Sequence, residues 1–167
     1  GDIDDKGVVQ MEKLLIRLRE ESFDRVYSSD SQRCKALADR IAELKSLRVY
    51  YSDLFREINN GDYWGKKKIE MDRLSWPDPL NTRPPHGESL QDLWERSREA
   101  KEYIVKSGEG RVILISHGLF LKFFLGSQIG LDALGAFKSL KFSNCALSEI
   151  ILDKNSCRIE YLNNRDY

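Results

Sequence analysis

Three side chains in this sequence have the chemistry to bind and transfer a phosphoryl group, namely Arg33, Glu57 and His117. An arginine offers a planar fork of N–H donors that matches the oxygens of a phosphate. A carboxylate can move a proton at a leaving oxygen, and an imidazole changes its charge near neutral pH. The combination therefore favours a site for a phosphorylated ligand.

Each of these residues follows a short segment that we expect to be a strand. The pair Ser28-Ser29 runs into Arg33. Glu57 follows the next predicted strand, and His117 comes directly after an apolar run. Ligands of open α/β sheets bind beyond the carboxyl ends of the strands, where a helix N-terminus also offers backbone donors to an anion. We therefore expect the three residues at one edge of a sheet.

Taken singly, each residue has a simpler interpretation. An arginine such as Arg33 on a helix is usually a solvated charge or one half of an ion pair, and an isolated glutamate such as Glu57 carries no signal. His117 is more informative, because it follows an apolar strand and precedes a glycine, which exposes a titratable group at a sheet edge. From the residues alone, the sequence supports an α/β domain with an anion site and nothing finer.

Helices and strands alternate along the chain, which indicates a layered α/β domain. Helices are predicted over about 4–18, 30–47 and 89–107, with Val8, Leu44 and Val105 among their inward-facing residues, and an apolar helix follows His117. Strands are predicted over 23–29, 49–51, 112–115, 146–152 and 158–162, the last two as a hairpin around 153–155. The run 112–115 is wholly apolar, as in strands buried on both faces. Segment 56–85 is rich in Gly and Pro and is predicted to be an irregular functional loop.

The composition indicates one domain over residues 1–167, with 41% hydrophobic and 32% charged residues. Lys plus Arg equals Asp plus Glu, at 27 each, so we expect no nucleic-acid partner. The odd number of cysteines, without C-x-x-C spacing, predicts reduced, buried thiols in a cytoplasmic protein rather than a disulfide framework or a zinc site. The most apolar stretch, 118–131, is short and interrupted by polar residues, and the N-terminus has no signal-peptide pattern, so no membrane association is expected.

Several segments, in order, resemble motifs of the histidine phosphatase superfamily, the phosphoglycerate-mutase-like proteins. They are the segment 2–10, YSSDSQRCKALA (27–38), LFREINNGDYWG (54–65), PPHGES (84–89) followed by Arg96, and ILISHG (113–118). Together they cover nearly the whole chain. The resemblance implies a three-layer α/β/α fold with helices on both faces of the sheet.

The resemblance also implies roles for the matching residues. Arg33 would bind phosphate, Glu57 would donate a proton to the leaving group, and His117 would be the second histidine of the phosphate pocket. Further substrate-binding positions would be Gly118, Glu88 and Ser89. No metal or cofactor is expected, because in this family the phosphoryl group passes to a histidine.

The sequence departs from the family at its start. The family opens with an interior strand ending in Arg-His-Gly, whose histidine is the nucleophile, and this sequence begins after that motif. Of its two histidines, His117 already has a place and His86 is not an obvious substitute. A sheet without an interior strand has unpaired backbone groups and a hole in its core. We therefore expect the strand to come from residues outside this sequence. A second polypeptide, or a sheet closed around the gap, are the alternatives.

The implied function is hydrolysis of a small phosphorylated substrate, a phosphomonoester, through a phosphohistidine on a segment outside this chain. The compact length and the ending YLNNR are most like small phosphatases such as α-ribazole phosphatase. Phosphoglycerate mutase activity is one alternative. Another is an inactive domain that binds a phosphorylated ligand or a protein partner, so the sequence leaves open whether this chain alone is an enzyme, and whether it forms a homodimer. An unrelated α/β domain would show a different sheet order.

Overall fold

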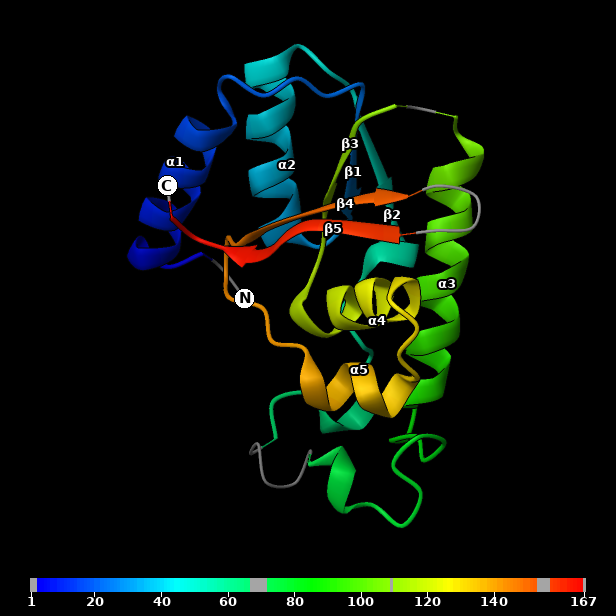
Figure 1. Ribbon diagram of the computed structural model, residues 1–167. Coiled ribbons are helices and arrows are strands. Elements are labelled where there is room, and N and C mark those ends of the chain that lie inside the picture. Colours follow the sequence, from blue (N-terminus) through cyan, green and yellow to red (C-terminus); the bar gives the residue numbers. More distant parts are fainter. Residues whose placement is uncertain (1–2, 67–71, 109, 153–156, 167) are drawn as a thin grey trace.

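The computed structural model describes residues 3–66, 72–108, 110–152 and 157–166 (Figure 1). The helices are α1 (Asp5–Leu18), α2 (Gln32–Lys45), α3 (Leu90–Lys106), α4 (Gly118–Gln128) and α5 (Ala133–Ser139). The strands are β1 (Arg25–Ser29), β2 (Val49–Ser52), β3 (Val112–Ile115), β4 (Leu147–Leu152) and β5 (Cys157–Asn164). Within 56–85 the described residues form only short 3-10 turns, at Gly61–Tyr63 and Arg73–Ser75, so the prediction of an irregular segment is confirmed.

The strands form a parallel sheet and a separate antiparallel hairpin. The parallel sheet has the order β2-β1-β3, with Val26 of β1 opposite Val49 on one side and Ile113 on the other. Strands β4 and β5 pair antiparallel, which confirms the predicted hairpin, while its predicted turn at 153–155 lies outside the described residues. Since β1, β2 and β3 are parallel, their carboxyl ends lie at one edge of the sheet.

Neighbouring residues of β1 face opposite layers of the domain. Val26 packs with apolar residues of α1 and α2, including Leu15 and Ile41. Tyr27 packs in a second cluster with residues of α3, α4 and α5, such as Phe120. This alternation is what a sheet covered on both faces requires, because successive side chains of a strand point to opposite sides. The predicted three-layer α/β/α arrangement is confirmed (Figure 1).

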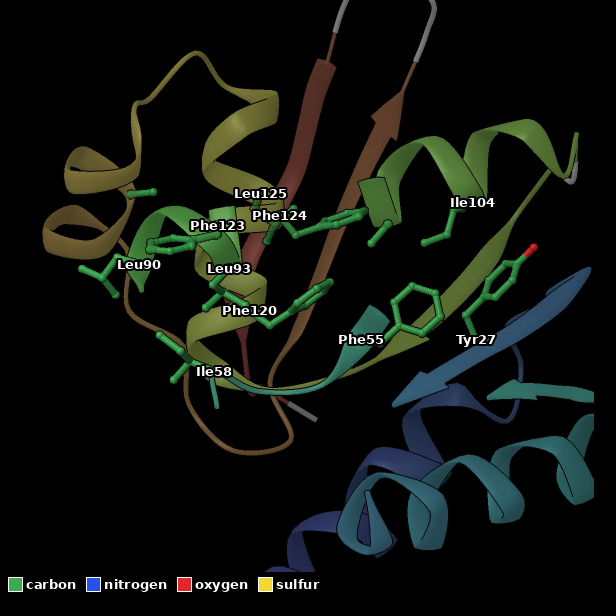
Figure 2. Packing of buried hydrophobic residues seen from close by; sticks show 12 residues of the cluster. Tyr27, Phe55, Ile58, Leu90, Leu93, Ile104, Phe120, Phe123, Phe124 and Leu125 are labelled. Atoms are coloured by element: carbon green, nitrogen blue, oxygen red, sulfur yellow. The ribbon is translucent and has the colours of Figure 1, made fainter. Parts of the chain in front are cut away.

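The larger core is rich in aromatic residues and lies between β1 and α4 (Figure 2). Phe55, which ends the turn after β2, is fully buried, with its ring centroid 5.9 Å from that of Tyr27 and 6.2 Å from that of Phe120. Edge-to-face pairs of this kind add to the stabilisation from burial. Because Phe55 is anchored in this core, the residues that follow it start from a fixed position.

Three predictions of buried helical residues are wrong. Val8, Leu44 and Val105 are 42%, 40% and 55% exposed. Each lies in the first or last turn of its helix, where neighbouring elements cover less of the helix surface. The apolar periodicity identified the buried stripe correctly in the middle of the helices, and it could not show where the covering layer ends.

The prediction that 112–115 is buried on both faces is also wrong in part. Ile115 is buried, whereas Val112, Ile113 and Leu114 are only partly covered. The reason is that β3 is an edge strand in the described part of the chain, paired only with β1. Its other side faces a cavity of about 1070 Å³ that is lined by β3, β4, α1 and α4. A strand with an all-apolar sequence therefore has one uncovered side.

The cysteines are free thiols, of which Cys34 is buried, while Cys145 and Cys157 are only partly buried. Within the described ranges, no helix combines the length and the apolar composition needed to cross a membrane.

Candidate active site

The structure brings Arg33, Glu57 and His117 together at the carboxyl edge of the parallel sheet. All three line a cavity of about 330 Å³. Arg33 lies in the first turn of α2 after β1, Glu57 lies in the loop after β2, and His117 follows β3. The three positions meet because each comes just after the end of one of three adjacent parallel strands.

His117 is only 6% exposed, so the prediction of an exposed group at the sheet edge is wrong. Its ring is instead surrounded by hydrogen-bonding groups from α2 and the end of β1. The Arg33 guanidinium donates to Nδ1 at 2.6 Å, and Nε2 lies 2.9 Å from the Ser29 hydroxyl and 3.2 Å from that of Ser31. Burial, then the positive charges of Arg33 and Arg96, lower the pKa of His117 from 6.5 to about 4. The imidazole is therefore neutral at pH 7, and with Nδ1 accepting from arginine its proton is on Nε2.

Cys34 adds a thiol to the same cluster, with its sulfur 3.6 Å from Nε2 of His117. Burial raises the pKa of the Cys34 thiol, so it is protonated at neutral pH. The thiol is therefore a packing partner of the imidazole rather than a nucleophile.

Glu57 caps helix α4. His117 is the residue that precedes the helix, yet its side chain makes no capping hydrogen bond. Instead, the Glu57 carboxylate accepts hydrogen bonds from the backbone N–H groups of Leu119 at 3.2 Å and Phe120 at 3.1 Å. It also accepts one from the backbone N–H of the next residue, Ile58, at 3.1 Å. A carboxylate at a helix N-terminus is stabilised by these donors and by the helix dipole. The imidazole of His117 is thereby left to face the cavity.

Sequence reasoning missed several residues that line the cavity. They are Ser31, Arg56, Ile58, Asn59, Asn60 and Trp64. Arg56 donates to Asp30 at 2.6 Å and, through this hydrogen bond above all, keeps the pKa of that carboxyl low. The signal that could have identified these residues is their position, since all except Ser31 belong to the loop that carries Glu57.

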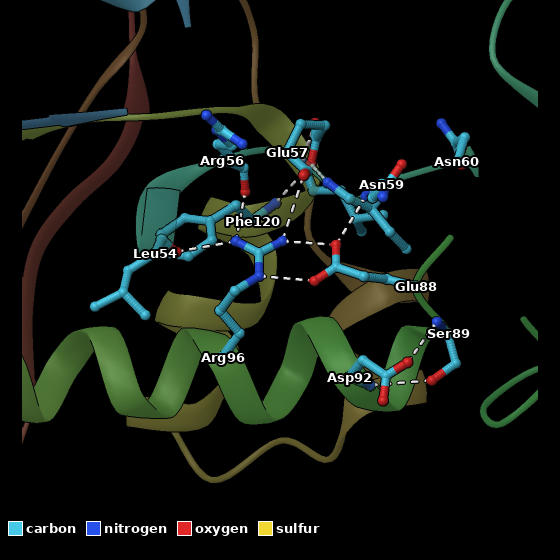
Figure 3. Close-up of polar contacts among 12 residues, drawn as sticks. Leu54, Arg56, Glu57, Asn59, Asn60, Glu88, Ser89, Asp92, Arg96 and Phe120 are labelled. Carbon is cyan, nitrogen blue, oxygen red and sulfur yellow. Dashed lines mark hydrogen bonds and ion pairs between the residues drawn. The ribbon is translucent and has the colours of Figure 1, made fainter. Parts of the chain in front are cut away.

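The other predicted binding residues lie elsewhere. Glu88 and Ser89 do not line the 330 Å³ cavity. Glu88 forms a bidentate ion pair with Arg96, at 2.8 Å for both contacts, and Ser89 is buried in a capping box with Asp92 at the start of α3 (Figure 3). Gly118 is the first residue of α4 and lines the larger cavity.

The two cavities adjoin at the three candidate residues. Arg33, Glu57 and His117 line both the 330 Å³ cavity and the 1070 Å³ cavity between β3 and β4. No cluster of His, Cys, Asp or Glu suited to holding a metal ion occurs within the described ranges. A buried neutral imidazole beside a guanidinium, with a carboxylate nearby, is an arrangement suited to an oxyanion.

The model of the histidine phosphatase superfamily (branch 1) matches residues 2–165. The chain belongs to this superfamily. The resemblance drawn from the motifs is therefore confirmed.

Proteins similar to this chain carry different names. The chain is 30% identical to a probable phosphoglycerate mutase GpmB of Shigella boydii over 156 residues, 87% of this chain and 71% of the relative. A relative of the same name in Erwinia tasmaniensis is 29% identical over 154 residues, with the same coverage. Among solved structures, the α-ribazole phosphatase of Shigella flexneri aligns with a TM-score of 0.87 at 20% identity, over 98% of this chain and 85% of that one. A mycobacterial glucosyl-3-phosphoglycerate phosphatase in complex with VO3 aligns with a TM-score of 0.80 at 23% identity, over 97% and 87%. These structural matches establish the shared fold.

Proposed function

We propose that this domain hydrolyses small phosphomonoesters through a phosphohistidine, and that the nucleophilic histidine is on a strand from a segment outside this sequence. The observation that carries the proposal is the 1070 Å³ cavity between β3 and β4, which reaches Arg33 and His117. A site for phosphate and a place for one more strand thus meet at the same point.

The cavity has the properties of a strand site. Strand β3 has one edge without a strand partner in the described residues, and β4 pairs on one side only, with β5. An inserted strand would give both edges backbone hydrogen bonds, which buried peptide groups require. The cavity lining is largely apolar and includes Ile113, Leu114 and Ile150. A strand with apolar side chains would therefore also fill the core, which favours polypeptide over a small ligand as the occupant.

The chemistry would proceed in two displacements. In the first, a ring nitrogen of the nucleophilic histidine forms a bond to phosphorus while the ester P–O bond breaks, and the leaving oxygen takes a proton from Glu57. In the second, a water oxygen bonds to phosphorus as the P–N bond of the phosphohistidine breaks, and the water gives a proton to Glu57. Inorganic phosphate leaves and the histidine is regenerated. Arg33 would bind the phosphoryl oxygens, and His117 would donate its Nε2–H to the same group once phosphate draws Arg33 away from the ring.

The direct test is to trap the phosphorylated intermediate of the full-length native protein. The protein is mixed with p-nitrophenyl phosphate, quenched at alkaline pH, where phosphohistidine survives, and digested for mass spectrometry. We expect turnover and a phosphohistidine in a peptide that lies outside residues 1–167. Phosphate on His86 or His117 would place the nucleophile within this chain and overturn the proposal. Absence of turnover, with retained vanadate binding, would indicate a domain that only binds phosphorylated ligands.

A mutase is the second candidate, because the curated relatives at 29–30% identity are named probable phosphoglycerate mutases. A mutase returns the phosphoryl group to substrate instead of water. Incubation with 3-phosphoglycerate, followed by phosphorus NMR, separates the two functions. Accumulation of 2-phosphoglycerate would establish the mutase, whereas inorganic phosphate alone would establish the phosphatase.

A further inference from the structure

We propose that Arg96 and Glu88 form a positioning pair that fixes the backbone around Glu57 and thereby aims its carboxylate at the leaving group. The inference rests on the proposed phosphatase function, in which Glu57 is the proton donor. Neither Arg96 nor Glu88 lines the phosphate cavity, so the pair acts through Glu57 and not on the substrate.

The guanidinium of Arg96 donates hydrogen bonds to three backbone carbonyl groups in and just before the loop that carries Glu57 (Figure 3). Its Nη1 donates to the carbonyl oxygens of Leu54 at 2.9 Å and Arg56 at 2.8 Å, and its Nη2 donates to that of Glu57 at 3.3 Å. One side chain of α3 therefore holds the backbone carbonyl group of Glu57 and those of two residues that precede it.

Glu88 holds the other side of the same loop. Its two carboxylate oxygens accept Nε and Nη2 of Arg96, and one of them also accepts the backbone N–H of Asn59 at 2.8 Å. The side chains of Arg96 and Glu88 are only 16% and 24% exposed, so solvent screens the pair less than it screens a surface ion pair. The backbone on both sides of Glu57 is thus tied to a single ion pair.

The carboxylate of Glu57 is tied to the same cluster. The Arg96 guanidinium lies 5.8 Å from the ring centroid of Phe120, and the N–H of Phe120 donates to the Glu57 carboxylate. Arg96 therefore contacts the main chain of Glu57 directly and its carboxylate through Phe120. This arrangement needs the planar fork of an arginine, because an ammonium group cannot serve a bidentate carboxylate and several carbonyls in one plane.

The chain offers a matched control on the same helix start. Arg83 forms a bidentate pair with Asp92, but its side chain is 63% exposed, and within the described residues it forms no hydrogen bond to the loop of Glu57. We therefore compare Arg96→Lys and Glu88→Gln with Arg83→Lys in the full-length protein. Each substitution keeps the size or the charge of the side chain, and far-UV circular dichroism verifies that each variant is folded.

The decisive measurement uses two substrates that differ in their need for an acid. Phenyl phosphate releases phenolate, whose conjugate acid has a pKa of about 10, whereas p-nitrophenolate leaves readily without protonation. If Arg96 positions the acid, Arg96→Lys and Glu88→Gln should lower kcat/KM, which reports formation of the phosphohistidine and departure of the leaving group, on the order of 10²-fold for phenyl phosphate and by less than about tenfold for p-nitrophenyl phosphate. Equal losses on both substrates would mean general structural damage and would overturn the inference. Arg83→Lys should change neither.

A second readout does not depend on turnover. The Leu119 and Phe120 amides donate to Glu57, so their hydrogen exchange reports where its carboxylate lies. In Arg96→Lys we expect both amides to exchange about tenfold faster, with no change in Arg83→Lys. Unchanged exchange would refute the positioning role. If the wild type hydrolyses neither substrate, the proposed function fails, and the exchange rates still decide whether Arg96 positions Glu57.

Discussion

Nη2 of Arg33 lies 2.6 Å from Nδ1 of His117, although the two residues are 84 positions apart in the sequence. Because a guanidinium keeps its protons at all physiological pH values, this contact makes Nδ1 an acceptor and leaves the proton of the neutral ring on Nε2. The 330 Å³ cavity is therefore lined by a fixed cation next to an imidazole in a defined tautomer. A bound phosphoryl group would compete with His117 for the same guanidinium.

Replacing Arg33 should weaken anion binding. We expect Arg33→Ala to reduce the affinity for vanadate on the order of tenfold or more, since a charge-assisted hydrogen bond contributes about 1.5–3 kcal/mol. Isothermal titration calorimetry measures this. Arg40→Ala on the exposed side of the same helix is the control and should bind as the wild type does. Equal affinities in both variants would remove Arg33 from the pocket.

The buried imidazole should make the fold sensitive to mild acid. The pKa of His117 is about 4 in the folded protein and 6.5 as the reference value, so the unfolded chain takes up a proton first as the pH falls. The contribution of the neutral His117 ring to the unfolding free energy is present above pH 6.5 and is lost progressively between pH 6.5 and 4. Compared with His117→Gln, we expect the wild type to lose about 3 kcal/mol of unfolding free energy over this range. Urea unfolding curves at several pH values test this, and parallel losses in both proteins would contradict it.

Glu57 should stabilise the fold as well as serve the site. Glu57→Ala removes the acceptor of the first N–H groups of α4, so we expect about 1–2 kcal/mol of destabilisation in urea unfolding. The ring resonances of His117 should also shift, because His117 begins that helix. Asp132→Ala removes the cap of α5 and is the control. Asp132→Ala should lower the unfolding free energy by a similar amount without shifting the His117 resonances. A shift of these resonances in Asp132→Ala would show that the effect is not local to α4.

Gly87 lies where its own loop packs against the loop that carries Glu57, and we expect no side chain to be tolerated there. A Cβ at this position would lie 2.5 Å from Cγ of Pro84 and 2.7 Å from the carbonyl oxygen of Asn59. We expect Gly87→Ala to lower the unfolding free energy by about 1–3 kcal/mol, because the loop of Glu57 must move to make room. At Gly118 an added Cβ meets nothing within 4 Å, so Gly118→Ala should be neutral or slightly stabilising when both variants are compared by urea unfolding.

The sequence was sufficient for most of the elements, although not for α5, and for the candidate residues. Apolar residues at helical spacing identified α1, α2 and α3, and the ends of three predicted strands identified Arg33, Glu57 and His117. These features are local, since hydrophobic period and strand ends are written within about twenty residues. The order of the motifs along the chain was equally readable, and it led to the family.

Only the tertiary structure decided what these residues do to one another. The capping of α4 by Glu57 spans 62 and 63 positions, and the three carbonyls on Arg96 come from 39 to 42 positions away. The uncovered side of β3 likewise depends on which strand lies next to it, not on its own apolar sequence. Such contacts follow from the packing of layers on a sheet, and no spacing within one segment encodes them. The residue types determined which chemistry is available, and the packing determined which groups hydrogen-bond to one another.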